Sequence, residues 1–165
     1  PRMAAPIGLT SWDWLSEGEV AGAPINYGGS NLMMNALDHA RFGHLYVNAG
    51  KWNGEQILPA GWVKKSTRNQ VPLDLPPADN DRADTEGRGI YGYNWWIINK
   101  GKDAPVAGAF TSGLNHNVCL VVPEWDMVIV RMGVDGNPEG ITKHAVYSEV
   151  LRRLAPGVTY LYPTK

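Results

Sequence analysis

The segment TSGLNHNVCLVVPEWDMVIV, residues 111–130, contains two short apolar runs that are rich in β-branched residues. The sequence Pro-Glu-Trp-Asp at 123–126 separates the two runs and has the composition of a tight turn. Short β-branched runs joined by a turn are typical of paired antiparallel strands. We therefore predict a hairpin with strands at about 116–122 and 126–132, and with the segment around 108–113 on its far side.

The chain on either side of this hairpin adds elements to the predicted sheet. Residues 91–99, YGYNWWIIN, form another aromatic and β-branched run and indicate a further strand. After the hairpin, Asn137 and Pro138 have the order of a helix cap followed by a first-turn proline. A helix is predicted over about 140–154, and an apolar stripe would place it on the sheet. The stripe consists of Tyr147, Val150, Leu151 and Leu154.

A second helix is predicted upstream, in the segment NALDHARFGHLYVNAG. Asn35 is a candidate N-cap, Asp38 complements the first-turn N–H groups, and Gly50 follows the expected end of the helix. We expect this helix at about 36–48. A shorter helix should begin at Pro59 and end near residue 67.

Two segments lack a sustained hydrophobic period. Residues 1–32 are rich in Gly, Pro, Ser and Trp, and they predict an ordered loop with one short helical turn. Residues 70–89 are rich in proline and acidic residues, and they predict a surface excursion or a mobile loop. The expected class is therefore α+β, with an antiparallel sheet packed against helices.

Composition excludes several classes of function. A length of 165 residues with 44% hydrophobic and 19% charged residues is ordinary for one domain, and the net charge of -1 gives no reason to expect nucleic acid as a partner. No apolar run approaches the roughly 18 residues that a membrane span needs. A single cysteine cannot form an internal disulfide and leaves the redox compartment open.

Histidine and cysteine side chains do not suggest a metal site. His39 and His44 are five residues apart on the predicted helix, so they lie on nearly opposite sides and cannot share one ion. Solvated or capping roles are expected for both. Cys119 lies between apolar strand residues and is expected to be a small buried hydrophobe. We expect neither a metal nor an organic cofactor.

Small and polar residues interrupt the predicted strand at 108–117, GAFTSGLNHN. Such an interruption occurs where a strand backbone lies open to a ligand. It also occurs in a glycine-containing bulge or hairpin with no binding role. Local chemistry leaves both interpretations open.

Four segments, taken in chain order, resemble the C-terminal half of the β-lactamase-related serine hydrolases. That family includes class C β-lactamases, D-alanyl-D-alanine carboxypeptidases, esterases and 6-aminohexanoate-oligomer hydrolases. The resemblance covers about residues 4–155, and its most specific part is the helix motif from Asp38 to Phe42 followed by Ile57 to Pro59. The four segments are PIGLTSW, YGGSNLMMNALDHARFGHLYVNAGKWNGEQILP, YGYNWWI and TSGLNHNVCLVVPEWDMVIV.

The resemblance implies a partial β-lactamase/transpeptidase-like fold that lacks its N-terminal part. Residues 1–165 would be the C-terminal portion of a single domain, with a mostly helical lobe and loops in 1–90. Residues 91–165 would supply the sheet strands and the C-terminal helix. The compartment implied is periplasmic or secreted, and a cytoplasmic location stays open.

The family's third active-site motif, Lys-Thr-Gly or His-Thr-Gly, falls by resemblance on Thr111, Ser112 and Gly113. Thr111 stands where the family often has a cation, which favours an ester or amide substrate over a carboxylate-bearing one. The N–H of Leu114 would contribute to the oxyanion hole. The implied substrate-binding residues are Tyr27, Gly28, Trp95, Asn115 and His116. The aromatic strand could equally form core, and we expect one of Trp95 and Trp96 to do so.

The family's nucleophile motif, Ser-x-x-Lys, is absent, because no serine of the sequence has a lysine three residues later. The Tyr-x-Asn match at 46–48 lies at the end of a helix and is interpreted as chance. The chain also begins at Pro1 rather than at a methionine. We interpret these features as a truncation that leaves this chain inactive by itself.

Three hypotheses follow. In the first, the chain is part of a serine hydrolase that acts on a small ester, amide, peptide-like or β-lactam substrate, and its partner is the missing N-terminal segment. In the second, it is a non-catalytic ligand-binding or regulatory module. In the third, it is a purely structural product of proteolysis.

Overall fold

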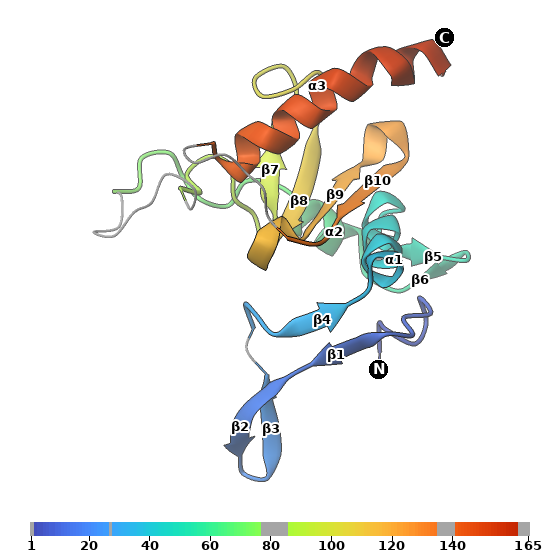
Figure 1. The fold of residues 1–165 in the computed structure, drawn as a ribbon, viewed down its shortest axis with the longest axis vertical. Coiled ribbons are helices and arrows are strands. Elements are labelled where there is room, and N and C mark those ends of the chain that lie inside the picture. The colour runs from blue at the N-terminus through green and yellow to red at the C-terminus, as the bar shows by residue number, and fades with distance from the viewer. Residues whose placement is uncertain (1, 27, 77–85, 135–140, 162–165) are drawn as a thin grey trace.

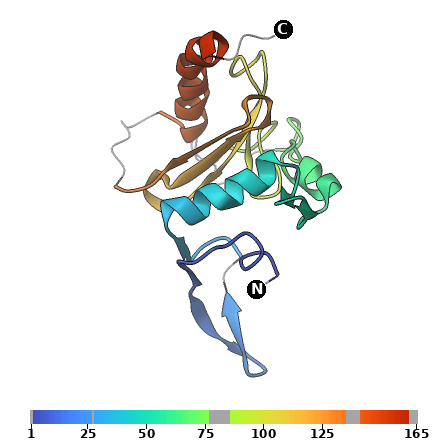
Figure 2. The same ribbon diagram turned by 90° about the vertical axis from the view of Figure 1, so that its right-hand side faces the viewer.

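The fold is an antiparallel sheet covered by a helix on each face, as seen in a computed structural model (Figure 1). The structure describes residues 2–26, 28–76, 86–134 and 141–161. Helix α1, Ala36–Val47, and helix α3, Lys143–Leu161, lie on opposite sides of the sheet (Figure 2). The α+β class predicted from the sequence is confirmed.

The main sheet has four strands in the order β10-β9-β8-β7. In chain order, the strands are β7 at Trp96–Ile98, β8 at Gly108–Ser112, β9 at Val118–Val122 and β10 at Met127–Arg131. All three pairings are antiparallel. The predicted hairpin and its neighbouring strand are therefore confirmed.

Strand β9 is buried along its whole length because both faces of the sheet are covered. On the α3 side, Leu120 packs in a cluster with Phe110 and Leu151. On the α1 side, Cys119 and Val121 pack in a second cluster. Coverage on both faces explains why β9 is a continuous apolar run rather than an alternating one.

Helix α1 has the predicted caps. The Asn35 side chain accepts a hydrogen bond from the Asp38 N–H, and Gly50 has φ +84°, in the left-handed region. The helix approaches the sheet closely at Gly43, where a Cβ atom would lie 2.6 Å from both Cys119 Sγ and Val128 Cγ1. A glycine at this position lets helix and sheet backbones come together.

The predicted short helix is α2, Ala60–Ser66, with Pro59 as its N-cap. Before it, β5 at Lys51–Trp52 and β6 at Glu55–Gln56 form a small hairpin around the Asn-Gly turn at 53–54.

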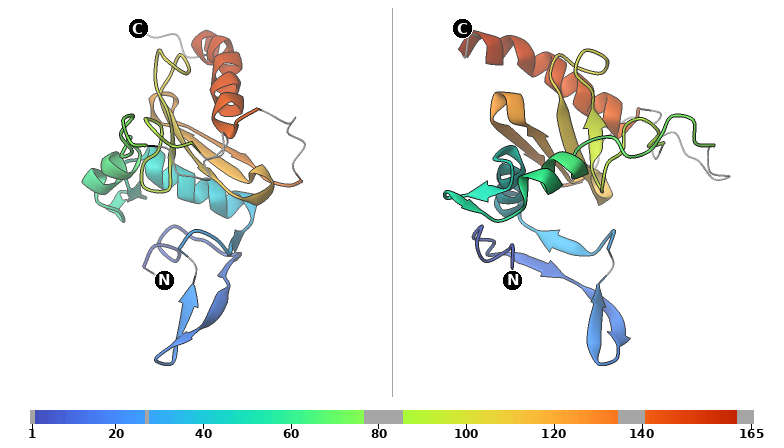
Figure 3. Two further views of the ribbon diagram at one scale, coloured as in Figure 1. Left: turned by 90° about the vertical axis from the view of Figure 1, so that its left-hand side faces the viewer. Right: turned by 180° about the vertical axis from the view of Figure 1, so that it is seen from behind.

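Four short strands begin and end within residues 12–34, so the prediction of a loop with a helical turn was wrong for this part of the chain. Strand β1 pairs with β4, and β2 pairs with β3, to form an extended arm that projects away from the sheet (Figure 3). The β1 and β4 partners are about 20 residues apart in sequence, and each strand is only three to five residues long, which hides any periodicity. The arm strands are β1 at Trp12–Trp14, β2 at Ser16–Val20, β3 at Ala23–Asn26 and β4 at Leu32–Met34.

Helix α3 packs on the sheet as predicted and continues beyond the expected end at 154, with Pro156 inside it. The predicted cap, Asn137 and Pro138, lies outside the described residues. Within the described ranges, no helix is both long enough and apolar enough to cross a membrane.

Candidate functional site

The predicted third-motif residues lie together at the end of β8 and in the turn that follows. Thr111 and Ser112 are the last residues of β8, and the 3-10 turn η1, Leu114–His116, follows Gly113. The turn is closed by the Gly113 N–H, which donates to the Asn117 carbonyl at 2.8 Å, and by the Asn117 N–H, which donates to the Leu114 carbonyl at 3.1 Å.

Arg131 at the end of β10 supports this turn from the neighbouring part of the sheet. Its guanidinium donates to the carbonyl oxygens of Asn115 and His116, the latter at 3.2 Å. Asn115 and His116 have φ values of +57° and +54°, in the left-handed region that costs energy for residues with a Cβ. The Arg131 hydrogen bonds help to offset that cost and fix the turn.

Leu114 presents its side chain and backbone at the tip of the turn. The residue is 83% exposed, and its N–H has no hydrogen-bond partner among the described residues. A free N–H directly after a strand end is the type of backbone donor that can stabilise an oxyanion.

The side chains of Thr111 and Ser112 point to opposite faces of the sheet, as neighbours on a strand do. The Thr111 hydroxyl lies 3.2 Å from His39 Nε2 on α1 and accepts a hydrogen bond from the Cys119 N–H at 3.3 Å. The Ser112 hydroxyl is buried and has no partner in the part of the chain that the structure describes. Neither hydroxyl is displayed at the tip of the turn.

His39 is one residue at this site that sequence reasoning missed. It was expected to be solvated or capping, yet it is partly buried between α1 and the sheet, and burial lowers its pKa. Its Nδ1 atom is buried without a partner among the described residues. Its position on the helix could have indicated this burial. Phe42 and Tyr46 follow His39 at i+3 and i+7, on the same side of the helix, and both pack in the α1-side cluster.

Lys143, at the start of α3, also went unnoticed. Its ammonium donates to the Gly113 carbonyl at 3.4 Å, which brings positive charge beside the turn from a distant part of the sequence. The sequence has no cationic residue at position 111, and the fold instead brings the Lys143 ammonium to this turn from α3.

Asp38 fixes the root of the arm to α1. Its fully buried carboxylate accepts hydrogen bonds from the Ser11 N–H at 2.7 Å and the Thr10 N–H at 3.0 Å, and pairs with Arg41 at 2.7 Å. Burial opposes ionisation, but these three donors together hold the pKa of Asp38 below its ordinary value.

The predicted substrate-binding residues are only partly brought together. Asn115 and His116 lie in the turn beside Leu114, whereas Gly28 lies on the arm, in the turn between β3 and β4. Tyr27 lies outside the described residues. Trp95 is only 2% exposed, which places it inside the α1-side cluster.

Trp95 and Trp96 pack on opposite faces of the sheet. Trp95 lies 4.5 Å from Tyr46 and 5.9 Å from Phe42 between ring centroids, whereas partly buried Trp96 packs on the α3-side cluster. Both rings therefore contribute to core packing.

Two other side chains with groups that could take part in a reaction are buried. Burial raises the pKa of Cys119 to about 12, despite a backbone hydrogen bond at Gly43 that acts in the opposite direction, so the thiol stays protonated. Its predicted role as a small buried hydrophobe is confirmed. Tyr46, the first residue of the Tyr-x-Asn match, is buried in the same cluster.

The sheet and its covering helices define the fold class of this chain, and solved structures with the same arrangement are known. The antiparallel sheet with its covering helices is α+β and matches part of a β-lactamase-like fold. A protein from Bacteroides dorei DSM 17855, assigned as a beta-lactamase, superposes with a TM-score of 0.61 and 18% identity over 96% of this chain. A protein from Bacillus anthracis, assigned as a 6-aminohexanoate-dimer hydrolase, superposes with a TM-score of 0.53 and 23% identity over 81% of it.

This chain spans 49% of the first of those structures and 31% of the second. At these identities the likeness is one of fold. No protein-family model matches the sequence, and no curated protein matches it.

Proposed function

We propose that this chain forms one wall of the active site of a serine hydrolase that transfers an acyl group from an ester, an amide or a β-lactam. The observation that carries the proposal is the N–H of Leu114, an exposed residue just after β8 in a partial β-lactamase-like fold, which has no hydrogen-bond partner among the described residues. In this role the N–H donates to the oxyanion of the tetrahedral intermediate.

The neighbouring residues have supporting roles in the proposal. Gly113 leaves the backbone open to the substrate, and Asn115 and His116 line the approach to it. The Thr111 hydroxyl is occupied by His39 and Cys119, so Thr111 positions the end of β8 rather than contacting the substrate. Arg131 keeps the turn rigid, which preserves the direction of the Leu114 N–H.

The nucleophile must come from a polypeptide segment that carries Ser-x-x-Lys, because no serine of this chain has a lysine one helical turn later. This chain covers 49% and 31% of the two superposed structures, and the part of those structures that it does not cover is where such a segment belongs in the proposal. Esters and amides are the favoured substrates, since position 111 holds threonine.

A second candidate is a ligand-binding or regulatory module of the same fold that performs no turnover. The absence of Ser-x-x-Lys from the sequence favours it. The coding sequence upstream of Pro1 separates the two candidates. A Ser-x-x-Lys segment there supports the hydrolase, and a start codon immediately before Pro1 supports the module.

The direct test uses a fluorophosphonate and a β-lactam as covalent probes, read by intact-mass spectrometry. The 165-residue chain alone should acquire no adduct. The full-length product should acquire one adduct, on the serine of Ser-x-x-Lys. A full-length product that contains Ser-x-x-Lys but reacts with neither probe and hydrolyses no p-nitrophenyl ester would contradict the proposal.

A further inference from the structure

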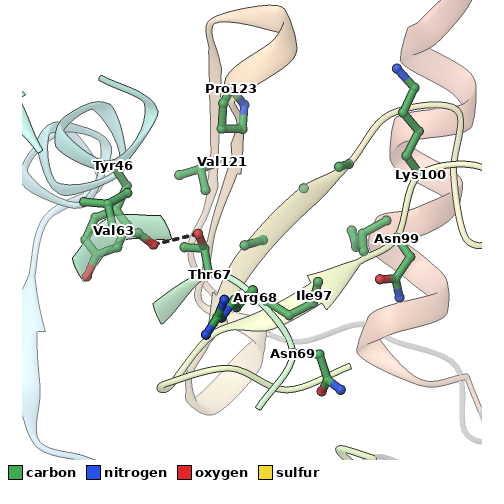
Figure 4. Close-up of a pocket in the computed structure, with 14 residues that line it drawn as sticks. Tyr46, Val63, Thr67, Arg68, Asn69, Ile97, Asn99, Lys100, Val121 and Pro123 are labelled. Atoms are coloured by element: carbon green, nitrogen blue, oxygen red, sulfur yellow. Dashed lines mark hydrogen bonds between the residues drawn. The ribbon is translucent and has the colours of Figure 1, made fainter. Parts of the chain in front are cut away.

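A pocket of about 300 Å³ opens between α1, α2 and the sheet (Figure 4). It includes Gly108 and Ala109, at the end of β8 opposite to Ser112. Four strand steps of about 3.3 Å separate Gly108 from Ser112, so these two ends of β8 lie roughly 13 Å apart. A volume of this size is at the small end of the range for small-molecule sites.

The floor of the pocket is apolar. It is formed by buried side chains from α1, α2 and three strands of the sheet. These side chains are Tyr46, Val63, Ile97, Ala109 and Val121. Such a floor binds the apolar body of a ligand by removing it from water.

Arg68 brings positive charge to the edge of this floor. It follows Thr67, the C-cap of α2, and its side chain lies beside Ile97 in the pocket (Figure 4). The chain on either side of it is anchored, because the Tyr93 N–H donates to the Ser66 carbonyl at 3.0 Å and the Gln70 N–H donates to the Tyr91 carbonyl at 2.7 Å. Arg68 forms no ion pair with any residue that the structure describes.

Apart from Tyr46, the other polar side chains that line the pocket already have partners among the described residues. The Thr67 hydroxyl donates to the Val63 carbonyl at 2.8 Å, and the Asn99 amide donates to Asp103 at 2.9 Å. Lys100 pairs with Glu124 at 2.8 Å. None of the described lining residues is acidic. The uncommitted charge at this pocket is therefore the Arg68 guanidinium.

We infer that this pocket binds a small monocarboxylate with an aromatic or short aliphatic body. The carboxylate accepts two parallel hydrogen bonds from Arg68, the geometry that a guanidinium fork favours. The body lies on the apolar floor against Ile97 and Val121. Inorganic phosphate has no apolar body and would make no contact of this kind with the floor. This inference stands on the pocket alone and does not depend on the hydrolase proposal.

Benzoate is the probe for the experiment, with binding followed by saturation-transfer difference NMR on the 165-residue chain. This measurement works whether the protein is monomeric or self-associated. Benzyl alcohol has the same ring without the charge, and inorganic phosphate has charge without the ring. Arg68→Gln removes the guanidinium at an exposed position, and Lys64→Gln is the matched control, since it removes one exposed positive charge from α2 without touching the pocket.

Benzoate should bind the wild-type chain and Lys64→Gln with a Kd on the order of 1 mM. Arg68→Gln should weaken benzoate binding roughly tenfold, as expected for the loss of a charge-assisted bidentate contact. Benzyl alcohol and phosphate should bind more weakly than benzoate. Equal benzoate affinity in Arg68→Gln, equal affinity for benzyl alcohol, or no benzoate signal up to about 20 mM would each overturn the inference.

Discussion

His39 Nε2 and Thr111 Oγ1 lie 3.2 Å apart and join helix α1 to the end of strand β8. The Thr111 oxygen also accepts the Cys119 N–H, and the tautomer of His39 decides whether Nε2 donates to the hydroxyl or accepts from it. Partial burial favours the neutral imidazole.

Stability should therefore fall in mildly acidic solution because of His39. Burial lowers the pKa of His39, so below the ordinary value of 6.5 the unfolded chain binds a proton that the folded protein does not. The contribution of neutral His39 is fully present above pH 6.5 and is lost as the pH falls below it. Melting temperatures between about pH 5 and 7.5 measure the effect.

The matched variants for this prediction are His39→Leu and His44→Leu, since His44 is exposed on the other side of the helix. His39→Leu should flatten the dependence of melting temperature on pH in this range and cost about 1 kcal/mol at neutral pH for the lost hydrogen bond. His44→Leu should preserve the dependence. An unchanged pH profile in His39→Leu would show that another group is responsible.

Asp38→Asn should lower the melting temperature and loosen the arm. An amide accepts fewer hydrogen bonds than a carboxylate and cannot form the ion pair with Arg41. The Ser11 and Thr10 N–H groups would lose part of their partner. Amide hydrogen exchange at these two residues should accelerate in the variant, whereas exchange within β9 should not.

The same residue predicts behaviour in strong acid. Since the pKa of Asp38 is held below its ordinary value of 3.8, its contribution is fully present above that pH. The contribution is lost as the pH falls through the lower folded pKa. We expect Asp38→Asn to lose a smaller part of its neutral-pH stability in acid than the wild-type chain does, because the variant has no carboxyl group at this position to protonate. Denaturation followed by circular dichroism at neutral and acidic pH measures both losses.

Gly43→Ala should destabilise the protein by about 1–3 kcal/mol through overpacking. The new methyl group would meet Cys119 Sγ and Val128 Cγ1, each at 2.6 Å. Adding Cys119→Ala to Gly43→Ala should recover part of the loss in urea denaturation. The control is Gly61→Ala in α2, where a Cβ meets nothing within 4 Å and should be neutral or stabilising by about 0.5–1 kcal/mol.

Leu114→Pro should abolish most of the hydrolase activity of a full-length protein, because proline has no N–H to donate to an oxyanion. Proline suits the first position of the η1 turn, so the fold should survive. A loss of about 10²–10³-fold in kcat is expected, against little change in Leu114→Ala, which keeps the N–H. Equal activities of the two variants would remove Leu114 from the oxyanion hole.

The outer edge of β10 should promote association of the isolated chain. Strand β10 pairs with β9 on one side and is the last strand of the described sheet on the other. Unpaired strand edges recruit further strands, and lysine at an edge discourages this. Sedimentation velocity should show concentration-dependent association that Met132→Lys reduces. A wild-type chain that stays monomeric at all concentrations would indicate that this edge needs no covering strand.

Elements specified by neighbouring residues were determined by the sequence. Asn35, Asp38 and Gly50 placed α1 correctly because caps and turns act over a few residues. The Pro-Glu-Trp-Asp turn between two apolar runs gave the β9–β10 hairpin for the same reason. The Thr111–His116 turn was also located from the sequence, since its residues are adjacent in the chain.

Contacts between distant segments were decided by the tertiary structure. The ladder that joins Trp12 to Met34 leaves no local period, so the arm was mistaken for a loop. The link from His39 to Thr111 spans 72 residues, and that from Lys143 to Gly113 spans 30. The burial of Trp95 likewise depends on where α1 crosses the sheet. Local propensity carries information over a few residues along the chain, whereas these contacts exist only once the whole sheet and its two covering helices have packed.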